Sequence, residues 1–330
     1  MVVALRCALL ALVPSILFLT APAPARPTIF PAPDREMMVP VKGGRIFVRV
    51  NGKLDGPNPP IILAHGGPGS THAGLLDALE LSDQRAVILY DQLDSGRSDQ
   101  PNNPANWRVD RFVDELEAIR VALGVTRWYV LGHSWGGTIA LEYGARRSAA
   151  LAGVVLASPL ISTRSWLLDA NALVAKLPLQ DQATIHACEG VKPPPVSACE
   201  LATAQFYSRF NSREPASPAR QAYRKNPQDR GFNKRLYETM WGKSEFVSTG
   251  TLRTYDGEPL LAKLDGQRTL FLVGQHDEAR PVTAESFAER VVGSELAVVP
   301  GASHSIFSDR PDETIALIRA WLARQDGRAR

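Results

Sequence analysis

The sequence predicts an α/β fold with a mostly parallel, doubly wound sheet, and two observations support this prediction. From about Val41 onward, short apolar runs alternate with segments of helical periodicity, which is typical of a parallel sheet whose strands are joined by helices. Several of these runs are continuously apolar rather than alternating, as in central strands that are covered on both faces. The alternation stops between Ser158 and about Leu264, which indicates an insertion.

Strands and helices follow one another along the rest of the chain. The segment RIFVRVNG at 45–52 alternates apolar and polar residues and ends in Asn-Gly, as a hairpin strand does. Buried strands are expected at 61–64, 86–90, 128–132, 153–158, 269–274 and 295–300. Helical patterns cover roughly 109–123, 136–146, 284–291 and 311–324.

The segment 159–264 is predicted to form a mainly helical cap between two parts of the core, at 41–158 and 265–330. It holds helical segments, a PPP stretch and several aromatic residues, but no strand–helix alternation. Because ligands of open α/β sheets bind beyond the C-terminal ends of the strands, we expect the cap to cover the functional site there.

The first 25 residues have the features of a secretory signal peptide. Arg6 precedes an apolar stretch at 8–20, and Ala23 and Ala25 occupy the small-residue positions of a cleavage site. The stretch is short for a membrane span, although an uncleaved anchor is the alternative. We expect cleavage after Ala25, a Pro-rich tether at 26–40, no stable membrane anchor afterwards, and a periplasmic or secreted protein.

Cysteine content agrees with export. Cys7 would leave with the signal peptide, and Cys188 and Cys199 then remain at the ends of a short Pro-rich loop. An even pair in an exported protein indicates a disulfide, and two unpaired thiols are the alternative. The net charge of +3 is spread along the chain without a long basic block, so nucleic acid is not an expected partner.

The most specific motif is GHSWG at 132–136, which follows a predicted strand and precedes a predicted helix. In that context G-x-S-x-G places the serine on a strained turn, where larger side chains at the glycine positions would clash with the strand and helix. The turn exposes the hydroxyl at a helix N-terminus, where backbone N–H groups favour developing negative charge. We predict that Ser134 is a nucleophile; the alternative is a purely structural turn.

A serine nucleophile needs a base, and in this arrangement the order along the chain is Ser, acid, His. His304 follows the last predicted strand on a loop of small residues and is our candidate, although it could be a solvent-exposed loop histidine. His186 lies in the insertion, and His276 precedes the acids that would have to come before the base.

The acid is expected at the end of the preceding strand, where HDEARP places Asp277 and Glu278 side by side. Asp256 and Asp265 lack that context. On sequence alone either of the adjacent carboxylates could orient the imidazole, and we expect that only one of them faces it.

Two backbone N–H groups must stabilise the negative charge that develops on the substrate oxygen. One is expected from Trp135, directly after the nucleophile. The other is expected from the loop HGGPGS at 65–70, with Gly67 as our choice.

With these residues identified, the chain resembles the proline iminopeptidase family of α/β-hydrolases. It is similar in particular to the branch that contains the tricorn-interacting aminopeptidase and bacterial L-amino acid amidases. The resemblance rests on HGGPG (65–69), DQLDSGRSD (91–99) and GHSWGG (132–137), with further agreement at 240–256, HDEARP and GASHSIF. It covers about Val41 to Arg324.

The resemblance implies the α/β-hydrolase fold with a cap and a serine aminopeptidase activity. Members of the family remove an N-terminal residue, often proline, from short peptides or hydrolyse amino acid amides, without a metal or cofactor. Their motifs imply that Glu245 and Glu278 hold the free α-ammonium of the substrate, which leaves Asp277 for His304. A buried cation requires anionic partners, which agrees with this assignment. The alternatives are an exposed cap residue for Glu245 and a loop salt bridge for Glu278.

One position departs from the family pattern. Asp94 stands where the family usually has the first glycine of D-Q-x-G-x-G-x-S. Aspartate tolerates a positive φ better than most residues, so we expect the loop to keep its shape.

Two other functions stay open: an esterase or amidase that needs no free amine, and a non-catalytic binding protein with a hydrolase fold. The complete Ser–Asp–His order argues against the second. Epoxide or haloalkane hydrolysis is not expected, because those chemistries use a carboxylate at the position of Ser134.

Overall fold

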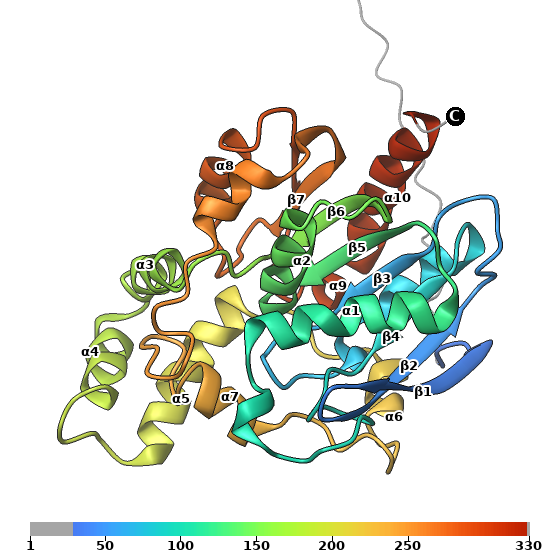
Figure 1. Ribbon diagram of the computed structural model, residues 1–330. Helices are drawn as coiled ribbons and strands as arrows, with labels where there is room; N and C mark the ends of the chain where they lie inside the picture. Colours follow the sequence, from blue (N-terminus) through green and yellow to red (C-terminus); the bar gives the residue numbers. More distant parts are fainter. Residues whose placement is uncertain (1–28, 329–330) are drawn as a thin grey trace, which may run out of the picture.

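The computed structural model describes residues 29–328, and the predicted signal peptide lies outside them. The described residues form one eight-stranded sheet of order β1-β2-β4-β3-β5-β6-β7-β8, in which the strands from β4 to β8 run parallel (Figure 1). β1 and β2 are antiparallel to their neighbours. The predicted α/β fold with a mostly parallel sheet is therefore confirmed.

The strands β2 to β8 lie within a few residues of the predicted runs, and the central strands β3 to β7 are almost entirely buried. Their bounds are β1 (Arg35–Val41), β2 (Gly44–Asn51), β3 (Ile61–Ala64), β4 (Val87–Tyr90), β5 (Trp128–His133), β6 (Leu151–Ala157), β7 (Thr269–Gly274) and β8 (Glu295–Val299).

Helices cover both faces of the sheet. On one face pack α1 (Val109–Leu123), α2 (Trp135–Ala145) and α8 (Pro281–Glu289); on the other pack the 3₁₀ helix η1 (His72–Asp83), α9 (Ile306–Asp309) and α10 (Pro311–Arg328). Within β3, Ile62 and Ala64 join the first core cluster and Ile61 and Leu63 join the second. This alternation follows from the two-residue period of a strand, and it explains why every residue of β3 is apolar.

The predicted tether at 26–40 is wrong for its last residues, because these form most of β1. β1 pairs with β2 along its whole length, from Arg35 opposite Val50 to Val41 opposite Gly44. Pro40 obscures the strand in the sequence, since proline lacks a donor for the sheet ladder; it is tolerated here because β1 lies at the edge of the sheet.

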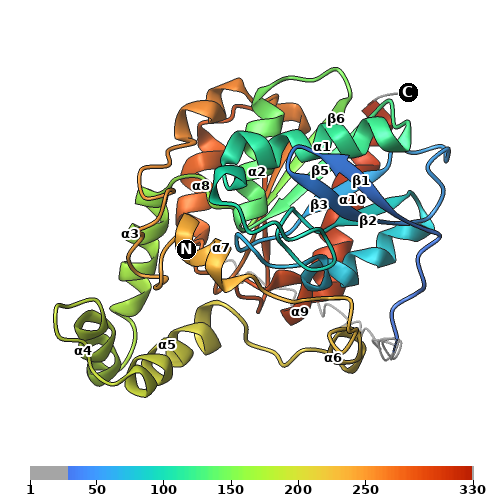
Figure 2. The same ribbon diagram turned by 60° about the horizontal axis from the view of Figure 1, so that its bottom comes forward.

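Between β6 and β7 the chain forms α3 (Thr163–Val174), α4 (Leu179–Cys188), α5 (Val196–Phe210), α6 (Pro218–Tyr223) and α7 (Lys234–Met240), followed by the 3₁₀ helices η3 (Glu258–Lys263) and η4 (Gly266–Arg268). Figure 2 shows α4 and α5 projecting from the side of the core. A disulfide joins Cys188 at the end of α4 to Cys199 in α5.

The end of α5 forms backbone hydrogen bonds with two loops of the core. The carbonyl of Phe210 accepts hydrogen bonds from the backbone N–H groups of Glu278 (3.1 Å) and His304 (3.0 Å), and the Asn211 carbonyl accepts one from Ser305 N–H (2.8 Å). The cap therefore contacts directly the two loops in which the acid and the base were predicted.

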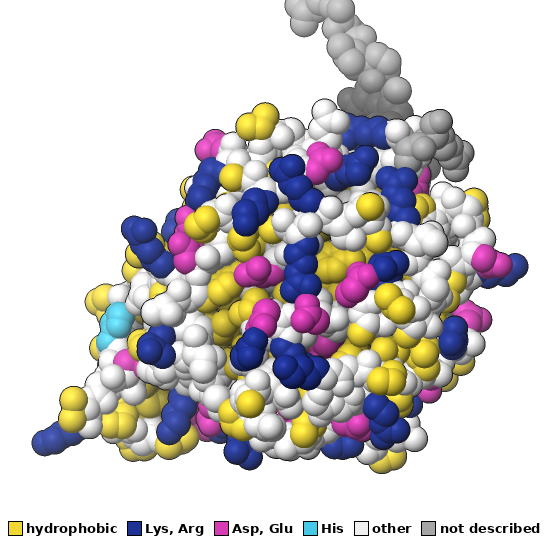
Figure 3. Space-filling model, viewed as in Figure 1, with side chains coloured by type: hydrophobic (Ala, Val, Ile, Leu, Met, Phe, Trp, Pro, Cys, Tyr) yellow, Lys and Arg dark blue, Asp and Glu magenta, His cyan; other side chains and the backbone are white. Residues whose placement is uncertain are grey.

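The surface carries mixed charge. On the face shown in Figure 3, basic and acidic side chains are interspersed, with no large area of one sign. Within residues 29–328, no helix is long and apolar enough to cross a bilayer.

Candidate active site

Ser134 lies on a tight turn between β5 and α2. Its φ of 59° and ψ of −122° are unusual for a residue with a side chain. A Cβ on Gly132 would come within 1.9 Å of the Gly136 carbonyl oxygen, and one on Gly136 within 2.1 Å of the Ala64 carbonyl oxygen. Only glycine fits at these two positions, so the G-x-S-x-G pattern follows from the close approach of strand, turn and helix.

His304 and Asp277 are brought together by the loops that follow β8 and β7. Asp277 Oδ1 lies 2.9 Å from His304 Nδ1 and also accepts a hydrogen bond from Ala279 N–H. Its Oδ2 accepts from Gly274 N–H (2.9 Å) and from the Ser158 hydroxyl (2.5 Å). The carboxylate is 1% exposed, and these bonds fix it in the orientation that holds the imidazole.

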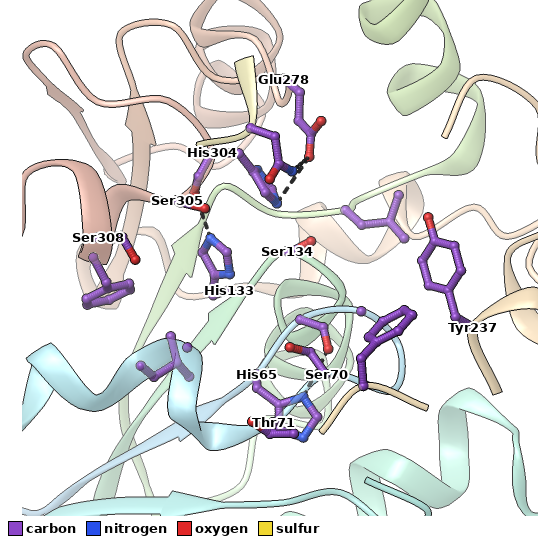
Figure 4. A pocket seen from close by; sticks show the side chains of 18 of the residues that line it. His65, Ser70, Thr71, His133, Ser134, Tyr237, Glu278, His304, Ser305 and Ser308 are labelled. Atoms are coloured by element: carbon purple, nitrogen blue, oxygen red, sulfur yellow. Dashed lines mark hydrogen bonds and ion pairs between the residues drawn. The ribbon is translucent and has the colours of Figure 1, made fainter. Parts of the chain in front are cut away.

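Glu278 contacts the other nitrogen of the same imidazole. Its Oε1 lies 3.5 Å from His304 Nε2 and accepts a hydrogen bond from Asn211 Nδ2 (2.8 Å). Figure 4 shows Glu278 and His304 together, with Ser134 below them in the view. The expectation that only one of the adjacent acids faces the imidazole is therefore wrong. The two carboxylates reach the ring from different sides, and each meets a different nitrogen.

The charges of these acids control the protonation of the imidazole. Burial alone would lower the pKa of His304, but the carboxylates of Glu278 and Asp277 outweigh it and raise that pKa to about 9. Burial raises the pKa of Glu278, and the charges of Glu245 and Asp277 act in the same direction, whereas the positive charge of His304 opposes them. The Glu278 carboxylate is therefore ionised most readily when a cation lies beside it. In the part of the chain that the structure describes, Ser134 Oγ makes no hydrogen bond to His304, as is common in unliganded catalytic sites.

Two backbone N–H groups beside Ser134 are free. Within residues 29–328, neither the Gly67 nor the Trp135 N–H donates to a protein acceptor. The backbone of the HGGPGS loop approaches the nucleophile closely, since a Cβ on Gly66 would lie 2.9 Å from the Ser134 Cβ. The two N–H groups are therefore available for an oxyanion, as proposed from the sequence.

A cavity of about 440 Å³ lies between the core and the cap, and Ser134, His304, Gly67 and both predicted glutamates line it. This volume is within the range of small-molecule sites, about 300–1,000 Å³. His186 is exposed on α4, and His276, in the loop after β7, is half-buried; neither lines this cavity.

Glu245, from the loop after α7, is held by three aromatic side chains. Its Oε1 accepts a hydrogen bond from Trp166 Nε1 (2.7 Å), and its Oε2 accepts from the hydroxyls of Tyr237 (2.9 Å) and Tyr207 (3.3 Å). Burial, with the charge of Glu245, raises the pKa of both tyrosines well above its usual value, so they remain donors. Trp166, Tyr207, Tyr237 and Asn211 were not singled out from the sequence, where nothing shows that residues on different cap helices meet at one carboxylate.

His133, inside the G-x-S-x-G motif, was also not singled out. Its Nε2 lies 2.8 Å from the His304 carbonyl oxygen. Burial and the neighbouring His304 lower the pKa of His133 to about 4, so it is neutral and donates this bond. It thereby supports the loop that carries the base.

Asp94 adopts the positive φ that its position requires, at 67°. Its buried carboxylate accepts hydrogen bonds from Trp107 Nε1 (2.7 Å) and Asn102 N–H (2.6 Å). The aspartate is thus accommodated at a positive φ, and its side chain adds hydrogen bonds that a glycine cannot make. Among the described residues, no cluster of three or more His, Cys, Asp or Glu side chains could hold a metal ion.

The fold and this arrangement of Ser134, His304 and Asp277 define an α/β-hydrolase. A family model described as the alpha/beta hydrolase fold matches residues 59–311. The chain is 35% identical to the proline iminopeptidase of Heyndrickxia coagulans over 87% of this chain and 98% of that protein. It is 33% identical to that of Levilactobacillus brevis over 88% of this chain and 97% of that protein.

A solved structure leads to the same family. The crystal structure of proline iminopeptidase from Mycobacterium smegmatis superposes with a TM-score of 0.79 at 31% identity, covering 90% of this chain and 100% of that one. The chain belongs to the proline iminopeptidase family of α/β-hydrolases and is an enzyme of the hydrolase class.

Proposed function

We propose that the protein is a serine aminopeptidase that removes an N-terminal proline, or another small apolar residue, from short peptides or from amino acid amides. One observation carries the proposal: two carboxylates, the half-buried Glu245 and the buried Glu278, line the same cavity as Ser134 and His304. The names of the relatives, proline iminopeptidases, support the same substrate class.

In this proposal the reaction passes through an acyl-enzyme. Ser134 Oγ attacks the carbonyl carbon of the N-terminal residue while His304 Nε2 takes the hydroxyl proton, and Asp277 stabilises the resulting imidazolium. The Gly67 and Trp135 N–H groups hold the oxyanion. His304 then protonates the leaving amine and the C–N bond breaks. Water attacks the acyl-enzyme with His304 again as the base, the Ser134 Oγ–C bond breaks, and His304 returns the proton to Ser134 Oγ as the free amino acid leaves.

The substrate ammonium would lie between Glu245 and Glu278. Glu278 Oε2 is buried and has no hydrogen-bond partner among the described residues, so it is left for an added donor. A hydrogen bond to a charged group contributes about 1.5–3 kcal/mol. A prolyl N-terminus has two N–H donors, which match one bond to each carboxylate. The aromatic side chains Trp166 and Tyr237 would cover the apolar ring.

Binding of the ammonium would also activate the base. With the cavity empty, the carboxylates of Glu278 and Asp277 raise the pKa of His304 and so favour the protonated imidazole. A substrate cation beside Glu278 compensates the negative charge that raises this pKa. The substrate would then release His304 to accept the proton of Ser134, so that an amine-bearing substrate promotes its own cleavage.

We also propose that the protein is exported, to the periplasm or the medium. The signal-like sequence at 1–25 and the disulfide between Cys188 and Cys199 both favour an oxidising compartment.

The test is a panel of aminoacyl arylamides, including proline, each with a free and an N-acetylated amine. The proposal expects the free prolyl arylamide to be cleaved at least about a hundredfold faster in kcat/KM, since two charge-assisted bonds are lost on acetylation. Ser134→Ala should abolish this activity. Equal rates on free and blocked substrates would instead favour an esterase or amidase with no need for an amine, and failure of a fluorophosphonate probe to label Ser134 would favour a non-catalytic protein.

A further inference from the structure

The charged side chains that line the active-site cavity are separated by sign. Among the described residues, this lining holds four Asp, Glu, Lys or Arg side chains, namely Glu245, Glu278, Arg220 and Arg224. The two glutamates belong to the part of the cavity described above, next to His304. The two arginines come from α6 and the residue that follows it.

Arg220 lies toward the opposite end of the cavity, and Arg224 is one helical turn farther along the chain. Figure 4 shows Tyr237, which donates to Glu245, and Ser308 on opposite sides of the view, with Ser134 between them. Arg220 lines a neighbouring recess together with Ser308, and it donates a hydrogen bond to the Ala73 carbonyl of η1 (2.8 Å). The acidic and basic ends therefore flank the nucleophile.

Arg220 is a buried anchor. It is 1% exposed, and its guanidinium forms a salt bridge with Asp77. Tyr223, on the same helix, has its hydroxyl 2.6 Å from His72 Nε2. These contacts hold α6 against η1, and the charge of Arg220 is already compensated by a carboxylate.

Arg224 is different, because its charge remains available. It follows directly on α6, and its backbone N–H donates to the Arg220 carbonyl (3.0 Å). The side chain is exposed at the cavity. Within residues 29–328, it forms no ion pair with a carboxylate. A fixed helix thus presents an uncompensated guanidinium to the end of the cavity remote from the glutamates.

We propose that Arg224 binds the C-terminal carboxylate of a short peptide substrate. The inference rests on the proposed aminopeptidase function, which places the substrate ammonium at Glu245 and Glu278 and its first carbonyl at Ser134. The rest of the peptide then runs toward α6, at about 3.5 Å per extended residue. A guanidinium matches a carboxylate through two parallel N–H···O bonds. The preferred substrates are therefore di- and tripeptides with a free carboxylate at the end of the leaving fragment.

The experiment compares Pro-Gly and Pro-Gly-Gly with their C-terminal amides, using release of free proline to obtain kcat/KM. The wild type should prefer the acid over the amide by about fivefold or more for at least one length, as expected for a partly exposed charge pair. Arg224→Gln should remove this preference by lowering kcat/KM for the free-acid peptide while leaving that for the amide unchanged. Arg224→Glu should reverse the preference. Lys225→Gln, which removes the same charge one residue away and outside the cavity lining, should keep the preference.

Prolyl arylamide, which has no carboxylate, separates the two proposals. If wild type and Arg224→Gln cleave it equally well and the acid preference disappears only in the variant, the subsite is supported. If both cleave it but the wild type has equal kcat/KM for the free-acid and amidated peptides, the carboxylate subsite is refuted and the proposed aminopeptidase function stands. If the wild type does not cleave it at all, the proposed function itself fails.

Discussion

Asp277 and Glu278 are consecutive in the chain, and their carboxylates contact opposite nitrogens of one imidazole. Asp277 Oδ1 lies 2.9 Å from His304 Nδ1, and Glu278 Oε1 lies 3.5 Å from His304 Nε2. Only Nε2 can exchange a proton with Ser134 once Asp277 holds Nδ1. The two acids are therefore not equivalent: one fixes the base, and the other lies where the substrate and the base meet.

Glu278→Gln should move the acidic limb of the pH profile to lower pH. The negative charge of Glu278 stabilises the imidazolium, so its removal lowers the pKa of His304 from about 9, and the neutral base is then present at lower pH. The measurement is kcat/KM against pH for an amine-free ester such as p-nitrophenyl acetate, because this profile reports the free enzyme. An unchanged limb, or a shift to higher pH, would contradict the electrostatic coupling.

Glu245→Gln should raise KM for prolyl arylamide about tenfold or more, which corresponds to the loss of about 1.4 kcal/mol or more from one charge-assisted hydrogen bond. The glutamine keeps the shape and one acceptor oxygen for Trp166, and its NH2 group can donate to the tyrosine hydroxyls, which accept as well as donate, so the cap should remain folded. Glu200→Gln, on the exposed surface of α5 and outside the cavity lining, is the matched control and should behave as wild type. Equal effects of the two variants would show that Glu245 has no special relation to the substrate.

Asp94→Ala should lower the free energy of unfolding by about 2–4 kcal/mol. The change leaves the buried Trp107 Nε1–H without its acceptor, which costs about 1–3 kcal/mol, and it puts alanine at a φ of 67°. Asp94→Asn keeps an acceptor oxygen and tolerates this φ, so this variant should lose less free energy of unfolding than Asp94→Ala. Urea denaturation of both variants measures the difference, and an Asp94→Ala variant as stable as wild type would refute the assigned role.

Replacing Cys188 and Cys199 together by alanine should lower stability without changing catalysis. A disulfide across a separation of 11 residues is expected to contribute about 2–3 kcal/mol by restricting the unfolded chain. Neither cysteine lines the cavity, so kcat/KM for prolyl arylamide should stay within about twofold of wild type. The wild type, but not the variant, should lose stability when a reductant is added.

The features that were predicted correctly are those fixed by local pattern or by backbone sterics. Continuous apolar runs predicted the central parallel strands, because a strand covered on both faces has few polar positions. The G-x-S-x-G turn could be located because only glycine fits at Gly132 and Gly136.

Other features depend on groups that are distant in sequence or on side-chain orientation. β1 was mistaken for part of a tether because a proline interrupts a short edge strand. The 3₁₀ helix η1, with about three residues per turn, lacks the 3.6-residue period of an α-helix. The contact between Glu278 and His304, and the aromatic side chains that hold Glu245, arise where the cap packs on the core, which no local pattern shows.

The most direct test of the two separate roles compares Asp277→Asn and Glu278→Gln on two substrates, prolyl arylamide and p-nitrophenyl acetate, at the pH optimum of each variant. We predict that Asp277→Asn lowers kcat on both substrates by about 10²–10⁴-fold, because the base loses its orientation. Glu278→Gln should lower kcat/KM for the prolyl substrate by about tenfold or more and leave the ester within about threefold of wild type. Equal losses on both substrates in both variants would contradict the assignment of different roles to the adjacent acids.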